Sequence, residues 1–115
     1  MISLIVVTYN SAHLLPAFAA ALDADTQAPA YELIIVDNAS HDQPWLVMPH
    51  AQWLRLPHNV GFGQACNRGT AQASGDYFVF LNPDVIVTTG WLQHLSTHLL
   101  HHADVALIEI GRAHV

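Results

Sequence analysis

The stretch from Tyr77 to Asp84 constrains the fold of this chain more than any other. It begins with five consecutive aromatic or aliphatic residues and ends abruptly in Asn82-Pro83-Asp84. An apolar run without polar alternation is typical of a strand buried on both faces, as in a parallel sheet. Pro83 cannot donate to a strand ladder, so regular pairing should stop there. Asp84 is then expected beyond the carboxyl end of the strand, the edge at which open α/β sheets bind ligands.

Two earlier apolar runs end in the same way. Ser3 to Thr8 runs into Tyr9-Asn10-Ser11, and Tyr31 to Val36 runs into Asp37-Asn38. The interval between the two runs exceeds the dozen or so residues that a crossover between parallel strands needs. It also carries apolar residues at helical spacing, namely Leu14, Leu15, Phe18, Ala19 and Leu22. The sequence therefore predicts an α/β fold, with a mostly parallel sheet flanked by helices.

The rest of the chain continues this pattern less clearly. Residues 41–52 contain two prolines and predict no definite element. Beyond them we expect a short strand at Trp53–Leu56, a glycine turn leading into a helix, a short extended piece at Val85–Val87, a helix at about 91–101 and a strand at Val105–Ile108.

Composition limits the class of protein and of partner. The chain has 115 residues, of which 52% are hydrophobic and 10% charged, as expected for one small globular domain or part of a larger one. Its net charge of −6, with three arginines and no lysine, argues against nucleic-acid binding. The single cysteine, Cys66, excludes an internal disulfide and a cysteine-based zinc cluster. No transmembrane segment and no signal peptide are visible, so a cytoplasmic protein is expected.

The polar clusters after the three strands can form one site. These clusters are Thr8-Tyr9-Asn10, Asp37-Asn38 and Asn82-Pro83-Asp84. The carboxyl ends of parallel strands share one edge of a sheet, so the clusters can converge on one cleft. Turn and cap residues would look the same at any one of these places. Three such clusters together with a glycine loop favour a binding site.

The two acidic residues of these clusters, Asp84 and Asp37, each have a specific chemical interpretation. Asp84 suits a ligand of Mg²⁺ or Mn²⁺, because these ions take one or two carboxylates plus substrate phosphate oxygens. The ion would stabilise charge on a diphosphate leaving group. Asp37 can accept the imide proton of uracil or thymine, or it can instead cap the turn that follows it.

The glycine loop and the histidines give weaker signals. Gly61 and Gly63 permit positive φ and close backbone approach, and the helix after them would present free amides to a phosphate. Arg68 on that helix either contacts an anion or lies on a solvated face. A dinucleotide fingerprint is disfavoured because the glycines do not follow the first strand. Four histidines at helical spacing, His94, His98, His101 and His102, mimic a metal site but have no accompanying carboxylate or cysteine.

Together these motifs resemble the family 2 glycosyltransferases of the GT-A fold, especially the rhamnosyltransferase-like members. The resemblance runs from Ile2 to about Ile108. It rests on five motifs in order: Leu4-Ile-Val-Val-Thr-Tyr-Asn10, Ile34-Ile-Val-Asp-Asn-Ala-Ser40, Asn59-Val-Gly-Phe-Gly63, Asn67-Arg-Gly69 and Phe80-Leu-Asn-Pro-Asp84.

The resemblance implies a site for a nucleotide-diphospho-sugar donor, with dTDP-rhamnose as the favoured donor. Asn82-Pro83-Asp84 occupies the place of the family's DxD motif, so Asp84 alone would bind the Mg²⁺ or Mn²⁺ cofactor. Thr8, Tyr9 and Asp37 would hold the nucleobase and ribose, and Arg68 would assist at the nucleotide. The nucleotide-sugar-binding residues implied in this way are Thr8, Tyr9, Asn10, Asp37, Asn38, Gly61, Gly63, Arg68 and Asn82. The residues after the second motif, His41 and Gln43, depart from the family's usual small residues.

Members of this family continue into an acceptor-binding half that supplies the general base. Asp104 comes too early to be that base, so residues 1–108 are interpreted as the truncated donor-binding half of an inverting glycosyltransferase, inactive by itself. A glycan or lipid-linked acceptor in cell-wall or polysaccharide biosynthesis is implied for the intact enzyme, which could be peripheral at the inner membrane face. A non-catalytic nucleotide-sugar-binding module and a GT-A-like nucleotidyltransferase are the alternatives.

The last residues, 109–115, resemble the in-frame translation of a sequencing adapter. They are therefore expected to be a non-native tail with no structural or functional meaning.

Overall fold

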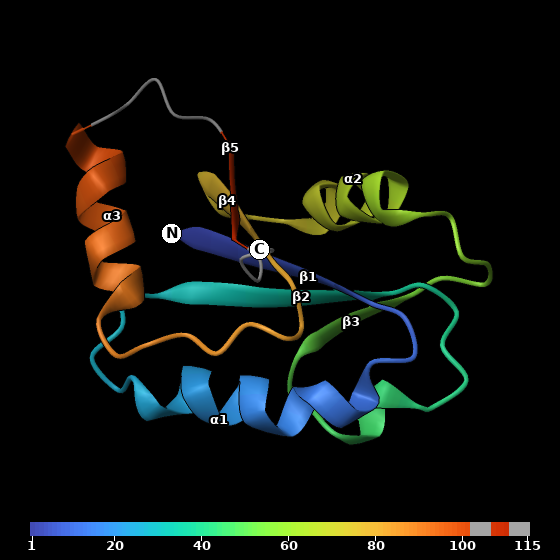
Figure 1. Cartoon of the computed structure of the whole chain (residues 1–115). Coiled ribbons are helices and arrows are strands. Elements are labelled where there is room, and N and C mark those ends of the chain that lie inside the picture. Colours follow the sequence, from blue (N-terminus) through green and yellow to red (C-terminus); the bar gives the residue numbers. More distant parts are fainter. Residues whose placement is uncertain (102–106, 111–115) are drawn as a thin grey trace, which may run out of the picture.

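A computed structural model of the chain describes residues 1–101 and 107–110 and contains one five-stranded sheet (Figure 1). The strands stand in the order β3-β2-β1-β4-β5, and every neighbouring pair is parallel. This confirms the α/β fold predicted from the alternating strand and helix patterns. The strands are β1 (Ile2–Thr8), β2 (Tyr31–Asp37), β3 (Gln52–Arg55), β4 (Tyr77–Leu81) and β5 (Leu107–Ile110).

Helices cover both faces of the sheet. In Figure 1, α1 and α2 lie on opposite sides of the strands, and α3 lies near their amino ends. Pro16 is tolerated because it stands in the first turn of α1, where its missing N–H breaks no helical hydrogen bond. The helical segments are η1 (Ala12–Leu14), α1 (Leu15–Ala24), η2 (Pro44–Leu46), α2 (Phe62–Gln72) and α3 (Trp91–His101).

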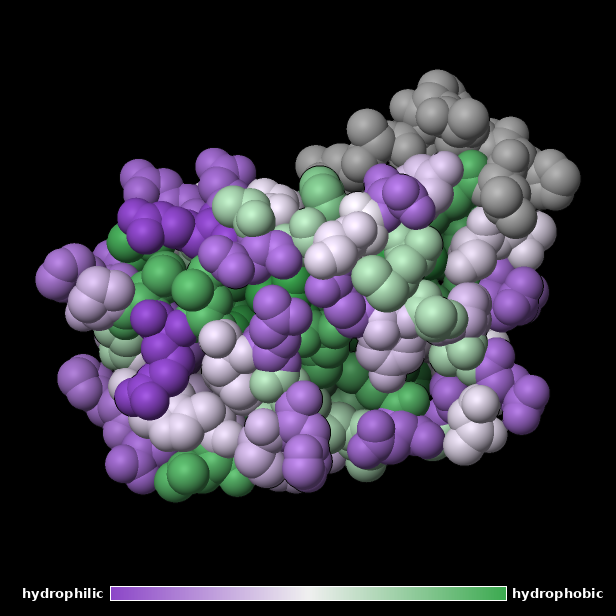
Figure 2. Space-filling view, turned by 180° about the vertical axis from the view of Figure 1, so that it is seen from behind, coloured by the Kyte–Doolittle hydropathy of each residue, from purple (hydrophilic) through white to green (hydrophobic). Residues whose placement is uncertain are grey.

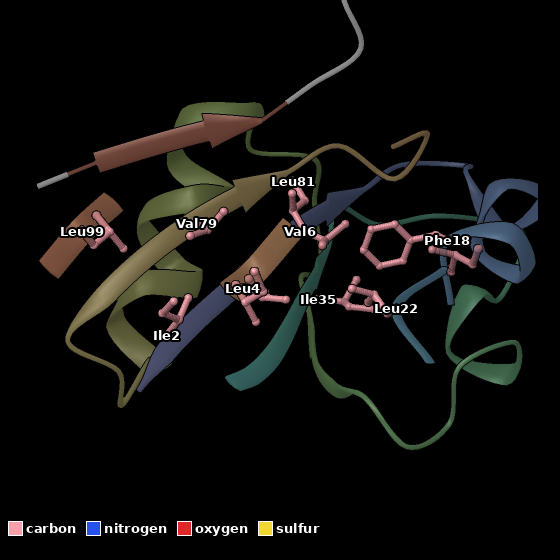
Figure 3. Packing of buried hydrophobic residues seen from close by; sticks show 11 residues of the cluster. Ile2, Leu4, Val6, Phe18, Leu22, Ile35, Val79, Leu81 and Leu99 are labelled. Carbon is pink, nitrogen blue, oxygen red and sulfur yellow. The ribbon is translucent and has the colours of Figure 1, made fainter. Parts of the chain in front are cut away.

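The larger hydrophobic core lies between the sheet and helices α1 and α3. Alternate residues of the strands point into it, and Phe18 and Leu22 of α1 pack against them (Figure 3). Alternation follows from the strand geometry, in which successive side chains project to opposite faces. The strand residues of this core are Ile2, Leu4, Val6, Ile35, Val79 and Leu81.

The opposite face is covered by α2 through small residues. Ala65 and Cys66 are buried there against Ile5, Val36 and Phe80, together with Ile34 and Leu56. Gly69 lets the helix approach closely, because a Cβ at this position would lie 2.8 Å from Cγ2 of Ile5. Burial of the strands on both faces explains why they contain so few polar residues.

A cluster of hydrogen bonds closes the amino edge of the sheet. Glu32 accepts from the Ser3 hydroxyl and from the amide N–H groups of Ser74 and Gly75. The Ser3 hydroxyl bond and the two amides lower the pKa of the Glu32 carboxyl against the opposing effect of burial. This cluster joins β1, β2 and the turn before β4 at the edge away from the predicted site.

The elements differ from the sequence-based expectations in a few places. β3 begins one residue early, at Gln52, and residues 41–52 contain the short helix η2. Val85–Val87, predicted as a short extended piece, is part of neither a helix nor a strand. The last strand spans Leu107–Ile110, and residues 105 and 106 of the predicted strand lie outside the described part of the chain.

Candidate functional site

The strand order brings the three predicted polar clusters to one edge of the sheet. β1 is central, with β2 on one side and β4 on the other, and the order of strands along the chain reverses next to β1. Neighbouring strands lie about 4.8 Å apart, so the carboxyl ends of β2 and β4 are separated by about 10 Å. Asp37 and the Asn82–Asp84 turn therefore flank the end of β1, as expected for a ligand site at a topological switch point.

Asp37 accepts several hydrogen bonds at this edge. Its Oδ1 accepts from Oγ1 of Thr8 at 2.7 Å and from the Ser40 hydroxyl, and its Oδ2 accepts from the Ser40 amide at 3.0 Å. Asp37 is only 1% exposed, and Thr8 is fully buried. A carboxylate has about four acceptor positions, so these three bonds leave one on Oδ2. Asp37 thus organises the turn after β2, and the use of its remaining acceptor position by a ligand stays a prediction.

The loops after β1 and β2 are tied together by side chains. The Asn10 amide donates to Oγ of Ser40, the His41 amide donates to Oδ1 of Asn10, and the Ala12 amide donates to Oδ2 of Asp42, each at 2.9 Å. Asn10 itself has a φ of 50°. These bonds leave the Tyr9 side chain 49% exposed at the rim of the site.

The same edge carries other exposed hydrophobic groups besides Tyr9. Phe62 begins α2 and Ile86 follows the turn after β4, and both are exposed. Seen from behind, the surface is mostly hydrophilic, with hydrophobic side chains showing in patches between the polar ones (Figure 2). Apolar surface at the rim can contact a planar ring of a ligand.

Asn38 holds the glycine loop in place. It is buried, its Nδ2 donates to the carbonyl oxygen of Gly61 at 3.2 Å, and its Oδ1 accepts from the Val60 amide at 3.0 Å. Gly61 has a φ of 83° and is the N-cap residue of α2. This positive φ is the conformation that glycine was predicted to permit here. Because both polar atoms of the Asn38 side chain serve this loop, its contact with a ligand stays a prediction.

The second glycine behaves differently from the expectation. Gly63 lies inside the first turn of α2, does not have a positive φ, and a Cβ there would meet no atom within 4 Å. Of the two glycines of this loop, only Gly61 therefore uses the conformational freedom of glycine. No side chain caps the start of α2, so the amides of its first turn face the carboxyl edge of the sheet without a capping partner.

Arg68 lies on the exposed side of α2. It lines a shallow hollow of about 350 Å³ together with Gln64, Asn67 and Ala71. It forms no ion pair with any carboxylate of the described residues. Arg68 takes no part in the hydrogen bonds around Asp37, so the structure does not bring these two predicted residues into direct contact.

The turn after β4 presents Asp84. The Val85 amide donates to the carbonyl oxygen of Asn82 at 3.1 Å, which closes a tight turn with Pro83 in its second position. Asp84 is half-buried, with its Oδ1 shielded from solvent. Within residues 1–101 and 107–110, no three His, Cys, Asp or Glu side chains form a metal cage. A single carboxylate at this edge of the sheet suits an ion whose other ligands are phosphate oxygens and water.

The histidines of α3 do not assemble into a metal site in the described part of the chain. His94 and His98 are exposed on the helix, and no third potential ligand joins them there. The side chain of His101 and the whole of His102 lie outside the described residues, as does Asp104.

A separate hollow of about 610 Å³ lies near the amino ends of β2 and β3. Its lining includes Asp23 from α1, Tyr31, Met48 and His50. Burial, together with Asp23 and Asp25, raises the pKa of the Tyr31 hydroxyl. This hollow is at the edge opposite Asp37 and does not belong to the candidate site.

Comparison with known proteins decides the family. Residues 3–113 match the sequence model described as Glycosyl transferase family 2. The chain belongs to this family. It is 27% identical over 112 residues to a dolichol-phosphate mannosyltransferase from Pyrococcus furiosus, and the match covers 92% of this chain and 32% of that protein.

Two solved structures show the same fold. The structure of S. aureus TarS residues 1–349 with UDP-GlcNAc has a TM-score of 0.79 and 25% sequence identity, over 89% of this chain and 32% of that one. Glucosyl-3-phosphoglycerate synthase from Mycobacterium tuberculosis, solved with Mn²⁺, UDP and glucosyl-3-phosphoglycerate, has a TM-score of 0.72 and 23% identity, over 87% and 39%. These matches confirm the GT-A fold and the family predicted from the five motifs. This glycosyltransferase-family chain spans about a third of the length of these proteins.

Several residues of the site were missed by the sequence reasoning. Ser40 and Asp42 connect the loops after β1 and β2, and the Asn59 Oδ1 accepts from the Gly61 amide at 2.9 Å. Arg55, the last residue of β3, lies over the ring of Trp45, and the sequence motifs singled out neither residue. Asn and Ser are common in turns, so composition gave no reason to single these residues out. The residue that ends β3 could have been found by asking which side chain stands next to Asp37.

No helix in the described part of this family member combines the length and apolar character needed to cross a bilayer.

Proposed function

We propose that this chain is the donor-binding part of a glycosyltransferase that takes its sugar from a nucleoside-diphospho-sugar. The observation that carries the proposal is the placement of Asp37 and the Asp84 turn on either side of the end of β1, in a chain of glycosyltransferase family 2. Solved relatives with UDP-GlcNAc, or with UDP and Mn²⁺, support it. A non-catalytic nucleotide-sugar-binding module is the second candidate, because the chain spans only about a third of its relatives.

The nucleobase and ribose would lie at the β1–β2 end of the site. The one acceptor position left on Asp37 matches a single imide N–H of uracil or thymine. Thr8 and Ser40 hold the Asp37 carboxylate by hydrogen bonds, so it need not reorient on binding. The exposed Tyr9 ring would contact the base, and Asn10 fixes the loop that carries Tyr9.

The diphosphate would lie at the β4 end. Asp84 would hold a Mg²⁺ or Mn²⁺ ion, which supplies charge neutralisation of the nucleoside diphosphate as it leaves. The free amides at the start of α2, after Gly61, and the Arg68 guanidinium add positive potential in a chain of net charge −6. Asn82 and Gly63 complete the proposed nucleotide-sugar-binding set.

The complete reaction would invert the anomeric carbon of the sugar. A general base would deprotonate an acceptor hydroxyl, which displaces the nucleoside diphosphate in one step. We propose that this base and the glycan or lipid-linked acceptor site belong to the half that the relatives have in addition, that residues 1–108 alone turn over little, and that residues 109–115 are not native. The proposal also includes dTDP-rhamnose as the donor and a role in cell-wall or polysaccharide biosynthesis. We further propose a cytoplasmic location, with the intact enzyme peripheral at the inner membrane face.

Calorimetric titration tests the donor site. We expect dTDP-, UDP- or GDP-sugars to bind the chain in the presence of Mn²⁺ and to bind at least tenfold more weakly without it, since the ion carries the main diphosphate contact. Asp84→Ala should abolish the difference, whereas Asp76→Ala, an exposed carboxylate at the opposite edge, should retain it. A nucleotide-sugar affinity that changes neither when Mn²⁺ is removed nor in the Asp84→Ala variant contradicts the proposal. Recovery of the full reading frame, with a downstream carboxylate able to act as base, separates the enzyme from the binding module.

A further inference from the structure

A basic side chain stands next to Asp37 on the neighbouring strand. Arg55 ends β3 and is the register partner of Asp37, which ends β2. The pairing is continued by the Leu56 amide, which donates to the Asp37 carbonyl oxygen at 2.9 Å. Trp53, two residues before Arg55, packs on the core under α1. Because side chains alternate along a strand, Arg55 projects to the same face as Trp53 and as its partner Asp37.

The Arg55 guanidinium rests on an aromatic ring instead of pairing with that carboxylate. Its Cζ lies 3.5 Å from the centroid of the Trp45 ring, which the short helix η2 supplies. Arg55 forms no ion pair with the carboxylates of the described residues. Stacking uses the face of the guanidinium, so the N–H groups in its plane stay available as donors. Trp45 thus holds an exposed, flat donor on the residue that pairs with Asp37 across the two strands.

The strands order these groups along the edge of the sheet. Arg55 ends β3, Asp37 ends β2, Thr8 ends β1 and the Asp84 turn follows β4. If the diphosphate lies at Asp84, the far side of the nucleobase lies at Arg55. The guanidinium is then too far along the edge to serve the phosphates.

We infer that Arg55, positioned by Trp45, is a specificity-determining residue of the donor site and donates a hydrogen bond to a nucleobase carbonyl. This inference rests on the proposed function. The adjacent N–H of the base would be accepted by Asp37, so the pair reads an N–H next to a C=O, as in uracil, thymine and guanine. Cytosine presents an amino group where uracil has the carbonyl and an unprotonated ring nitrogen where uracil has the N–H. The amino donor would then face the Arg55 donor, and the nitrogen lone pair would face the Asp37 carboxylate, so both contacts would be unfavourable.

Titration of the 115-residue chain with UDP and with CDP, both with Mg²⁺, tests this role. We expect the wild-type chain to prefer UDP. Arg55→Gln should weaken UDP binding about tenfold, the usual effect of losing one hydrogen bond from a charged group, and should leave CDP binding nearly unchanged. Trp45→Leu should shift the preference in the same direction by a smaller factor, because the guanidinium remains but is no longer held. Arg68→Gln is the matched control: it should weaken UDP and CDP by equal factors.

The outcomes separate this inference from the proposal beneath it. A wild-type chain that binds neither nucleotide overturns the proposed function, and the inference with it. If the wild-type chain binds UDP but Arg55→Gln leaves its affinity unchanged, or weakens UDP and CDP equally, the base-reading role is wrong while the donor site stands. Unchanged melting temperatures for Arg55→Gln and Trp45→Leu exclude unfolding as the cause.

Discussion

Replacing Thr8 by valine removes one hydrogen bond to Asp37 and keeps the shape of the side chain. Thr8 Oγ1 donates to Asp37 Oδ1 at 2.7 Å, and both side chains are buried. A hydrogen bond to a charged group contributes about 1.5–3 kcal/mol, so Thr8→Val should lower the free energy of unfolding by about 2 kcal/mol. For a domain of this size, that change corresponds to a fall in melting temperature of about 8 °C.

Urea denaturation followed by tryptophan fluorescence measures this change, and Thr8→Ser is its control. Serine keeps the hydroxyl and loses one buried methyl group, which costs about 1 kcal/mol. We therefore expect the valine variant to be the less stable of the two. A valine variant as stable as the wild-type chain would refute the reasoning, because the hydroxyl would then contribute nothing to holding the Asp37 carboxylate.

Three further predictions concern stability. Gly69→Ala should destabilise the chain by about 1 kcal/mol, because overpacking against Ile5 outweighs the gain in helix propensity. Gly63→Ala, in the same helix, places its Cβ near no other atom and should stabilise the chain by about 0.5 kcal/mol. Equal melting temperatures for the two variants would exclude the close packing of α2 on the sheet. Ala39→Gly should raise the unfolding free energy by about 1 kcal/mol, since Ala39 has a φ of 65°, and a loss of stability would show that the strain is absent. Because the pKa of the Glu32 carboxyl is lowered in the folded chain, Glu32 stabilises the fold fully above its ordinary pKa of 4.5, and this contribution is lost as the pH falls through the lowered value. Glu32→Gln should remove this dependence of the unfolding free energy on acid pH. A pH–stability curve identical to that of the wild-type chain would contradict the role of Glu32.

The sequence predicted the elements best where one physical constraint dominated. The uninterrupted apolar residues of β4 indicated a strand buried on both faces, and Tyr77–Leu81 has the predicted bounds. Residues 41–52 followed no single periodicity, because their structure depends on contacts with distant residues. The Ala12 amide, for example, donates to Oδ2 of Asp42 at 2.9 Å across 30 residues of sequence, a bond that no local pattern indicates.

The site was predictable at the level of its location and less so at the level of individual contacts. Asp37 and the Asp84 turn share an edge because parallel strands must end there together. Which residues of this edge can contact a ligand depends on the directions of their side chains, and the spacing of residues in the sequence does not determine these directions. Asn38 turns inward to the glycine loop, so its predicted contact with a ligand stays a prediction, and Arg55 turns onto Trp45, which makes it a new candidate.

Paramagnetic broadening by Mn²⁺ tests most directly whether this edge binds a metal-bound diphosphate. A ¹⁵N-labelled chain would receive UDP and then Mn²⁺ at a few per cent of the protein concentration. We expect the amide signals of Asp84 and Val85 to broaden first, and only when UDP is present. Broadening that begins at His94 and His98 of α3, or that is the same without UDP, would contradict it.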